Sequence, residues 1–437
     1  MKVLIISHNP LSTYQNMGKT MLALFEQFKP EELCQLYIYP SVPDVNKCNS
    51  YFRMTDKDIL RSYYKLRVKG VEVAPDITFH KKFSNAQDEK FYNNRKNQNS
   101  TRKLARDLMW KFSRWYNKEL QQWLDKERPD RIFLAPGDAR FIYDIALKIS
   151  RKRNIPIVTY VCDDYYFIKK SPYFLSRIHQ KLLHKKIERL FNRASHLITI
   201  CDELKHIYSE KFKLPTTTIM TGTNYPIAKR PVVGKEPQSI TYMGNVSLNR
   251  YVSLIDVGRA LDEINNELGT DCSLNIYTSL NDTMVIKEFE KVRSIALRGY
   301  VSGDEFSRVF HSSELLLHVE GFSEESIDRV KHSVSTKIAD SLGSGIPLIA
   351  YGPNNVASMK HLIRNNCAIA ITKKEELKDM LIKIFRDNDL QNLVTQRALC
   401  VANELHFAQT NSQNLYEILK IQSSVDIMES SVNDQDK

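Results

Sequence analysis

The segment S-T-K-I-A-D, Ser335 to Asp340, places a cation and a carboxylate where both could bind one ligand. Ser335 and Thr336 can cap a helix, which directs backbone N–H groups toward an anion, and Lys337 adds a positive charge. Asp340 lies one turn further along, on nearly the same helical face. This pattern suits a diphosphate and the hydroxyls of its ribose. Taken alone, however, these residues favour a plain ion pair that faces solvent.

Two further segments favour a ligand site. I-T-Y-M-G-N-V-S-L-N-R is a strand followed by the turn Gly244–Asn245 and by Arg250, which begins the next helix. L-R-G-Y-V-S is a strand that ends in a glycine turn just before Val301. Because the carboxyl ends of parallel strands meet at one edge of a sheet, we expect both turns beside the S-T-K turn.

The stretch T-Y-Q-N-M-G-K-T, near the N-terminus, ends like a P-loop. A P-loop needs a glycine at the position of Thr13, so an ATP or GTP site of that kind is disfavoured. Gly18 could let the backbone approach a ligand, with Lys19 and the following amide attracting phosphate at a helix N-terminus. Alternatively, Gly18 only permits tight packing of the loop.

Two carboxylates, Asp163 and Asp164, follow the predicted strand Pro156–Cys162. At a strand end they could position or polarise a hydroxyl of a ligand. They could equally cap the next segment and take no part in chemistry. The residues themselves leave both interpretations open.

Short β-branched runs alternate with amphipathic helical segments along the chain, as in parallel sheets with helical crossovers. Strands are expected at Lys2–Ser7, Gln35–Tyr39, Arg131–Ala135, Pro156–Cys162, His196–Cys201 and Thr217–Thr221, and then at Ser239–Met243, Leu274–Thr278, Ile295–Val301, Glu314–Val319, Pro347–Tyr351 and Ala368–Ile371. Helices are expected between them, notably at Lys19–Phe28, Phe141–Arg153, Glu203–Phe212, Leu248–Glu267 and Ser335–Leu342. The pattern predicts an α/β protein with two doubly wound, Rossmann-like domains facing each other across a cleft.

A stretch with three prolines and no periodicity, Thr223–Gln238, separates the two halves. We therefore expect an N-terminal domain at residues 1–225, a linker at 226–238 and a C-terminal domain at 239–400. A C-terminal helix at 401–422 could return to the N-terminal domain. The polar residues 423–437 are expected to be flexible.

The composition, with 42% hydrophobic residues in 437, is that of a soluble globular protein. No apolar run approaches the ~18–20 residues of a membrane span. The seven scattered cysteines form no CxxC pair, so we expect a cytoplasmic protein. The net charge of +12 favours an anionic partner. Nucleic acid is the weakest candidate, because no RNP-like, zinc-finger or helix-turn-helix signature accompanies the charge.

Two basic segments, Arg95–Arg128 and Lys169–Lys186, are expected to be helical. In the first, one face is expected to pack into the core through Leu104, Leu108, Phe112, Trp115, Tyr116, Leu120 and Trp123. Trp110 is expected on the opposite, basic face, where it would suit a membrane interface. We therefore expect peripheral attachment to an anionic membrane surface, with a solvated basic face as the alternative.

Four motifs follow one another in the second domain: Y-M-G-N-V-S-L-N-R, L-R-G-Y-V-S-G-D-E-F, E-L-L-L-H-V-E-G-F and S-T-K-I-A-D-S-L-G-S-G-I-P-L-I-A. H-N-P…N-M-G-K-T, Y-V-C-D-D-Y-Y and A-S-H-L-I-T-I-C-D-E-L extend the pattern more loosely over the first domain. Together these motifs resemble the nucleotide-sugar-dependent glycosyltransferases of the GT-B fold, in particular glycosyltransferase family 4.

The resemblance implies roles for the residues at matching positions. Arg250 would hold the donor diphosphate, with Asn245 in the place of the family's usual arginine. Lys337 and the two amides before it would hold the same diphosphate. Asp340 matches the second acid of the family's E-x7-E signature and would bind the ribose, and the backbone of Val301 would meet the base.

The chain departs from the family at the first acid of that signature, where His332 stands. Glu320 has the expected E-G-F context but lies further from the second acid, and Ser323–Lys331 looks like an insertion between them. Either residue could contact the donor sugar. Glu320 is favoured because it ends a strand.

On the acceptor side, Asp163 falls on the aspartate of the family's His-Asp pair, and Cys162 stands in the place of the histidine. Gly18 matches the first-domain glycine loop under the diphosphate. No D-x-D metal motif stands out, which agrees with transfer that requires no metal and no cofactor beyond the donor.

The resemblance thus implies a glycosyltransferase that uses a UDP- or GDP-sugar and a saccharide or lipid-linked saccharide acceptor. It also implies retention of anomeric configuration and a place in surface or capsular polysaccharide biosynthesis. A GT-B-fold nucleotide-sugar 2-epimerase is an alternative. A non-catalytic nucleotide-sugar-binding partner in a synthesis complex is another, to which the altered E-x7-E signature gives weight.

Overall fold

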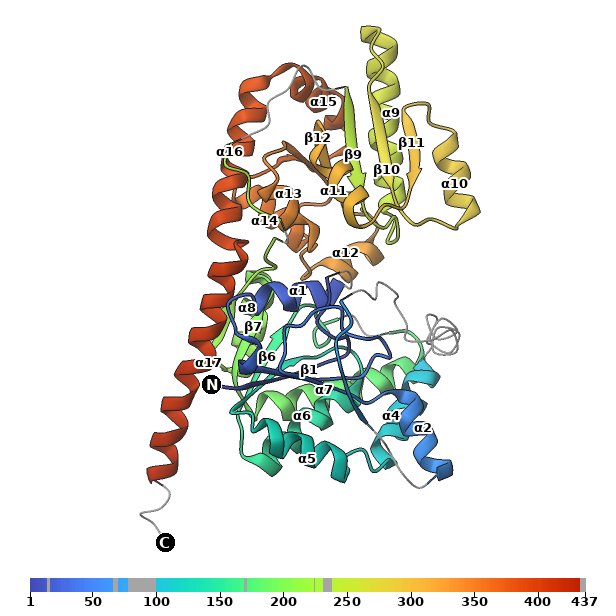
Figure 1. Cartoon of the computed structure of the whole chain (residues 1–437). Helices are drawn as coiled ribbons and strands as arrows, with labels where there is room; N and C mark the ends of the chain where they lie inside the picture. Colours follow the sequence, from blue (N-terminus) through green and yellow to red (C-terminus); the bar gives the residue numbers. More distant parts are fainter. Residues whose placement is uncertain are drawn as a thin grey trace. The chain divides into compact units, whose positions relative to one another are not determined.

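The structure is a computed structural model that describes residues 1–13, 16–65, 70–77, 100–168, 171–223, 225–230 and 238–432. The chain divides into two compact units. Unit 1 combines Met1–Thr221 with Ala408–Lys437, and unit 2 is Gly222–Phe407. Each unit is a β-sheet covered by helices (Figure 1).

The sheet of unit 1 contains eight strands among the described residues, in the order β4-β3-β2-β1-β5-β6-β7-β8. They are β1 Val3–Ser7, β2 Leu33–Tyr37, β3 Ser50–Arg53, β4 Val71–Val73, β5 Arg131–Ala135, β6 Ile157–Val161, β7 Ala194–Thr199 and β8 Thr216–Thr218. All neighbours are parallel except β3 and β4. Every residue of β1, β2, β5 and β6 is buried, as expected for parallel strands covered on both faces.

The helices of unit 1 are α1 Asn16–Leu24, α2 Asp56–Lys65, α4 Ser100–Phe112, α5 Lys118–Glu127, α6 Arg140–Arg153, α7 Phe174–Phe191, α8 Asp202–Phe212 and α17 Ala408–Val432, with a 3₁₀ turn at Pro30–Glu32. The last helix, α17, belongs to this unit although it ends the chain. Gln27 N–H donates to Ser412 Oγ (3.0 Å), and the Asn411 amide donates to Met220 O (2.9 Å). Helix α17 extends to Val432, into the segment 423–437 that the sequence predicts to be flexible.

The sheet of unit 2 has the order β11-β10-β9-β12-β13-β14, and all its neighbours are parallel. Its strands are β9 Ser239–Met243, β10 Ser273–Tyr277, β11 Ile295–Gly299, β12 Leu315–Val319, β13 Leu348–Tyr351 and β14 Ile369–Ile371. Its helices are α9 Arg250–Leu268, α10 Thr283–Glu290, α11 Gly303–His311, α12 Glu324–Val330, α13 Lys337–Gly343, α14 Ala357–Arg364, α15 Leu377–Arg386 and α16 Asn388–Leu405, with a 3₁₀ turn at Lys374–Glu376. The strand order reverses between β9 and β12, which is where ligands bind in doubly wound sheets.

The predicted α/β class, with two parallel Rossmann-like sheets, is confirmed. The sequence analysis did not predict β3, β4 or α2. All three lie between the predicted strands Gln35–Tyr39 and Arg131–Ala135, where no strand was expected. Unit 2 begins at Gly222, before the predicted linker, and Ala228 N–H donates to Gly343 O (2.8 Å) within this unit. Residues 95–99, 169–170, 231–237 and 433–437 of the predicted basic segments, linker and tail lie outside the described residues.

The prediction of one continuous helical face over Arg95–Arg128 is wrong, although Trp115, Leu120 and Trp123 are buried as expected. Helix α4 ends at Phe112 and α5 begins at Lys118, so the two helices pack in different orientations. Leu108 and Phe112, expected in the core, are 50% and 69% exposed, whereas Trp110, expected outside, is 0% exposed.

The Trp110 ring stacks on Phe141, with a centroid distance of 4.4 Å. Its indole N–H donates to Asp56 Oδ1 (2.7 Å), which also accepts from Arg106 Nε (3.0 Å). Trp110 is therefore a core residue that satisfies a buried carboxylate, and it is not available to a membrane.

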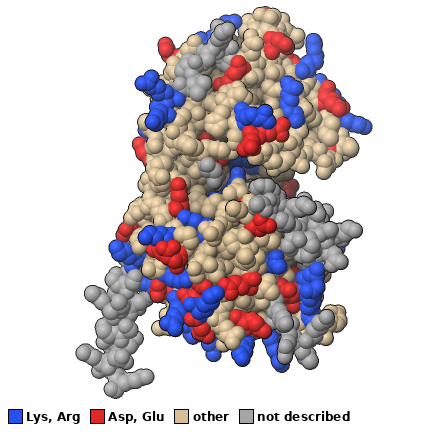
Figure 2. Space-filling view, viewed as in Figure 1, with Lys and Arg blue, Asp and Glu red and all other residues tan. Residues whose placement is uncertain are grey.

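No helix of the described residues is long and apolar enough to cross a membrane. On the face that Figure 2 shows, Lys and Arg side chains are interspersed with Asp and Glu. The excess positive charge is therefore not gathered into one patch on that face.

We predict that Trp110→Phe lowers the free energy of unfolding by ~1–3 kcal/mol, because it removes a hydrogen bond from the buried Asp56. Phe112→Leu on the same helix should change it by less than about 0.5 kcal/mol, because that ring is exposed. Urea unfolding of the full chain measures both values. A larger loss for Phe112→Leu than for Trp110→Phe would contradict this packing.

Candidate functional site

The turn between β9 and α9 is held by contacts from the segment that follows β12. Leu248 and Asn249 both have positive φ (55° and 56°), which lets the chain reverse before α9. Ser326 Oγ donates to Leu248 O (2.7 Å), and the Asn249 amide donates to Ser323 Oγ (2.9 Å). A Cβ atom on Gly321 would lie 2.2 Å from Leu248 O, so only glycine fits there. The predicted insertion, which forms α12, thus supports this turn.

Arg250, the first residue of α9, has its guanidinium bound on two sides. Its Nε and Nη2 donate to Glu320 Oε2 at 3.0 and 2.8 Å, and its Nη1 donates to Asn245 Oδ1 at 3.0 Å. Gly244 permits the preceding turn, because a Cβ atom there would lie 2.5 Å from Tyr242 Oη. The structure therefore brings together three residues from two separate sequence motifs, with Asn245 and Arg250 in one and Glu320 in the other.

Glu320 follows β12 and is 1% exposed. Its N–H donates to Tyr351 O (3.0 Å), and its carbonyl accepts from Ser253 Oγ (2.8 Å). His318 Nε2 lies 3.3 Å from the other carboxylate oxygen, within ion-pair distance but without hydrogen-bond geometry. Burial raises the pKa of Glu320, but His318 and Arg250 outweigh it and hold the pKa below its usual range. Glu320 is thus an ionised carboxylate that orients Arg250.

Of the two alternatives for the first acid, Glu320 reaches Arg250. His332 lies in the segment between α12 and α13. Glu320 reaches Arg250 because it follows the carboxyl end of β12, and β12 is the neighbour of β9, whose following turn carries Arg250.

Lys337 is the first residue of α13 and makes no ion pair with a described residue, so the predicted pair with Asp340 does not form. Part of its side chain is exposed to solvent. Partial desolvation of its amine and the positive charge of Arg250 lower the pKa of Lys337 to about 8. The negative charge of Asp340 raises this pKa but does not outweigh them. Asp340 Oδ1 accepts from Thr223 Oγ1 (2.8 Å). The Thr223 N–H in turn donates to His406 O (2.8 Å).

The predicted capping by Ser335 and Thr336 does not occur. Thr336 has a helical backbone (φ −60°, ψ −20°) instead of the extended conformation of an N-cap, and its side chain makes no cap hydrogen bond. The Ser335 N–H donates to Ser358 Oγ (3.1 Å). This amide is therefore already engaged, and Lys337 carries most of the positive charge at this helix end.

Beyond β11, Gly299 has a φ of 80° and Val301 is buried. An aromatic stack that was not predicted from the sequence includes two phenylalanines of α11, which follows Val301 in the chain. Tyr225 lies parallel to Phe306 and Phe310, with centroid distances of 6.3 and 5.9 Å. Tyr225 lies just after Gly222, where the chain enters unit 2, and this position could have indicated that its ring packs there.

In unit 1, Gly18 lies in the first turn of α1 and is buried. A Cβ atom there would lie 2.6 Å from Pro10 O and 2.9 Å from Ser12 Cβ. These contacts explain the glycine by tight packing of the loop, which was the simpler of the two interpretations. Lys19 follows it in the same helix and is partly exposed.

The two carboxylates after β6 differ in environment. Asp164 Oδ1 accepts from Tyr166 N (2.9 Å), Phe167 N (2.8 Å) and Tyr208 Oη (3.0 Å), so it caps the following segment. Asp163 is exposed. Burial, followed by the Asp163 charge, raises the pKa of the Cys162 thiol well above its usual range, so this thiol is a poor substitute for the family's histidine as a proton acceptor.

Further polar residues of unit 1, which the sequence analysis did not select, follow the strands at the same sheet edge. His8 follows β1, and Asp138 follows β5 and pairs with Lys103. Burial and Arg106 lower the pKa of His8 to about 4, so its imidazole is neutral at pH 7. Their positions at strand ends were the signal that could have identified them.

No protein-family model matches the sequence, and no curated protein matches it. Solved structures do match over nearly the whole chain. Anabaena HepE, solved with UDP and glucose, has a TM-score of 0.60 at 10% identity, over 96% of this chain and 99% of HepE.

Sucrose-phosphate synthase from Thermosynechococcus elongatus matches with a TM-score of 0.57 at 11% identity, over 97% of this chain and 99% of that enzyme. Trehalose 6-phosphate synthase from Burkholderia multivorans matches with 0.59 at 9% identity, over 98% of each chain. At such identities the likeness establishes the fold. The resemblance seen in the sequence is thus confirmed at that level: the chain has the GT-B fold of these glycosyltransferases.

Proposed function

We propose that the protein is a glycosyltransferase that transfers a sugar from a UDP- or GDP-sugar to a saccharide or lipid-linked saccharide acceptor. The observation that carries this proposal is the arrangement at the switch point of unit 2. There Glu320 and Asn245 orient the Arg250 guanidinium, and Lys337 adds a cation without an ion-pair partner among the described residues.

The chemistry follows from the charge of the leaving group. Breaking the bond between sugar and nucleotide develops negative charge on the diphosphate. Donors fixed before the reaction stabilise such charge without reorganising. Arg250 is fixed in this way by Glu320 and Asn245, and Lys337 supplies the second charge. Asp340, held by Thr223, would accept hydrogen bonds from the ribose.

Two observations on other proteins support a nucleotide-sugar donor. HepE was solved with UDP and with UDP-glucose, and it shares this fold. The motif resemblance to glycosyltransferase family 4 further supports retention of configuration and a place in surface or capsular polysaccharide biosynthesis. No cofactor besides the donor enters this proposal.

A non-catalytic nucleotide-sugar-binding partner is the second candidate. The full engagement of Glu320 with Arg250 favours it, because a carboxylate that is 1% exposed has little surface left for a sugar. Such a protein would bind the nucleotide sugar without consuming it.

We predict that Lys337→Ala weakens UDP or GDP binding by about 10–150-fold, because one charge-assisted contact contributes ~1.5–3 kcal/mol. Isothermal titration calorimetry with UDP and GDP measures the change, with the exposed Lys360→Ala on α14 as the matched control. Arg250→Ala should weaken binding too. It should also lower the Tm, because it leaves Glu320 buried without its partner. If Lys337→Ala bound both nucleotides as tightly as the parent chain, the site assignment would be wrong.

We predict that Asp163→Asn lowers donor turnover by about 100-fold or more, with little change in Tm, because an exposed carboxylate that polarises the acceptor is lost. Asp164→Asn should instead lower the Tm, because it weakens three hydrogen bonds. The readout is UDP released from UDP-glucose or UDP-N-acetylglucosamine, and GDP from GDP-mannose, with mixed oligosaccharide acceptors. Full turnover in Asp163→Asn would remove its catalytic role. Binding without any turnover by the parent chain would favour the second candidate.

We also propose a peripheral contact with an anionic membrane surface, now through the start of α7. Tyr173 and Phe174 are 75% and 70% exposed there, on a helix rich in lysine. We predict that the protein floats with phosphatidylglycerol liposomes at low salt, and that Phe174→Ala floats less than Met284→Ala, an exposed control on unit 2. Absence of the parent chain from anionic liposomes at low salt would contradict the contact.

A further inference from the structure

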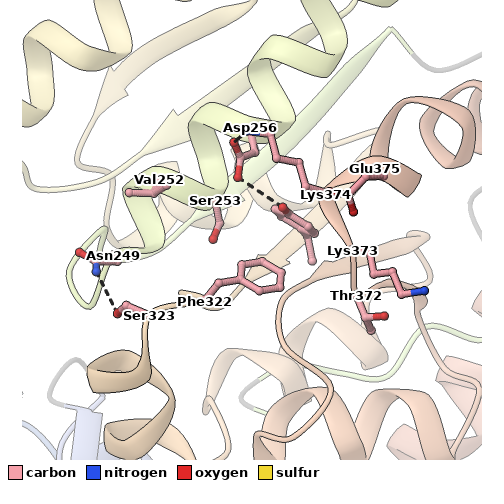
Figure 3. Close-up of a pocket in the computed structure, with 11 residues that line it drawn as sticks. Asn249, Val252, Ser253, Asp256, Phe322, Ser323, Thr372, Lys373, Lys374 and Glu375 are labelled. Atoms are coloured by element: carbon pink, nitrogen blue, oxygen red, sulfur yellow. Dashed lines mark hydrogen bonds and ion pairs between the residues drawn. The ribbon is translucent and has the colours of Figure 1, made fainter.

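A pocket of about 420 Å³ lies wholly within unit 2. The start of α9, the segment after β12, the end of β13 and the segment after β14 line it (Figure 3). Its volume falls in the range of small-molecule sites, and it is open to solvent on one side. Arg250, Lys337 and Asp340 are not among its lining residues. The pocket is therefore distinct from the proposed diphosphate site.

The lining of this pocket is electrically balanced. Two lysines and two carboxylates face it. Lys374 Nζ lies 2.6 Å from Asp256 Oδ1, and Lys373 Nζ lies 3.5 Å from Glu376 Oε1. Because each amine already has a carboxylate partner, the pocket offers no net positive charge to a phosphate. A neutral ligand fits this lining better than a nucleotide does.

The pocket combines an aromatic surface with fixed hydrogen-bonding groups. Phe322 is 39% exposed and packs beside Tyr351, with a centroid distance of 5.0 Å. Asp256 is held from two sides, by Lys374 and by the Tyr351 hydroxyl, which donates to Oδ2 (3.3 Å). The Thr372 hydroxyl makes no hydrogen bond with a described residue, so it is available to a ligand.

We propose that this pocket binds one neutral sugar ring of a saccharide chain, other than the sugar carried by the nucleotide. A pyranose has an apolar face of C–H groups that would pack on Phe322, and its hydroxyls would donate to Asp256 and exchange hydrogen bonds with Thr372. That the occupant belongs to the acceptor or product chain rests on the proposed function. Binding of a saccharide does not.

The pocket adjoins the diphosphate site, because two of its lining residues contact or closely follow Glu320. Ser253 lines the pocket, and its hydroxyl donates to the carbonyl of Glu320 (2.8 Å). Phe322 follows Glu320 by two positions on the same segment. A saccharide held here would therefore lie beside the backbone segment that carries Glu320, which is where a chain that receives sugars from the donor would need an anchor.

The experiment is binding of the full chain to an array of neutral and acidic oligosaccharides. The parent chain should bind neutral members. Phe322→Ala and Thr372→Val should each lose tenfold or more in apparent affinity for them. Leu393→Ala, which removes an exposed side chain from α16 of the same unit, is the matched control and should bind as the parent does. Calorimetry with UDP should give the same affinity for Phe322→Ala as for the parent chain.

Three results would overturn the proposal: no binding to any neutral oligosaccharide, unchanged binding in Phe322→Ala, or displacement of the bound oligosaccharide by saturating UDP-glucose. The last result would identify the pocket as part of the donor site. Failure of the proposed function would look different, because the parent chain would then bind neither UDP nor GDP while oligosaccharide binding persisted.

Discussion

A buried ion pair, Arg250 with Glu320, determines how the carboxyl edge of the second sheet is arranged. Removing two charges from water is costly, and the pair alone does not recover that cost unless the remaining polar atoms are also satisfied. The structure meets this condition for the guanidinium of Arg250 and for the backbone of Glu320. Asn245 accepts from the third guanidinium nitrogen, His318 lies near the second carboxylate oxygen, and the backbone of Glu320 is held by Tyr351 and Ser253.

This arrangement explains why the segment around Glu320 departs from the motif it resembles. The carboxylate is committed to the arginine, and the residues after it form α12, which holds the Leu248–Asn249 turn through two serine hydroxyls. Helix α12 therefore supports the turn that precedes Arg250. Asn245, which stands where the family has an arginine, accepts a hydrogen bond from Arg250 and so adds orientation instead of charge.

Much of the fold and part of the site could be predicted from the sequence, because both depend on local patterns. Buried strands of parallel sheets read as apolar runs, and polar residues directly after those runs mark the ligand edge. That reasoning selected Glu320 and Asp163, which the structure has just after β12 and β6. It failed for Trp110 because a helical wheel assumes one continuous helix. Asn117, whose side chain accepts from Leu120 N–H as the N-cap of α5, marked the break.

Other features of the site depend on contacts between segments that are distant in sequence, and local sequence patterns do not predict such contacts. Ser358 engages the amide of Ser335, and Thr223 reaches Asp340. Asp163 and Asp164 are adjacent in the sequence, so their neighbours do not distinguish them. The conformation of the loop after β6 decides that Asp164 is the one that accepts hydrogen bonds from the following backbone. The pocket of Phe322, Asp256 and Thr372 exists only because four separate chain segments meet at one edge.

The hydrogen bond from Thr223 N–H to His406 O has a consequence for how this chain can diverge. The backbone passes between the units twice, after Thr221 and after Phe407, and this one bond joins the residues beside both passages. Both bonded residues belong to unit 2, so the bond ties the two passages together where each of them meets that unit. Relatives of this protein should therefore keep the lengths of the segments beside Thr223 and His406 more constant than the lengths of exposed loops.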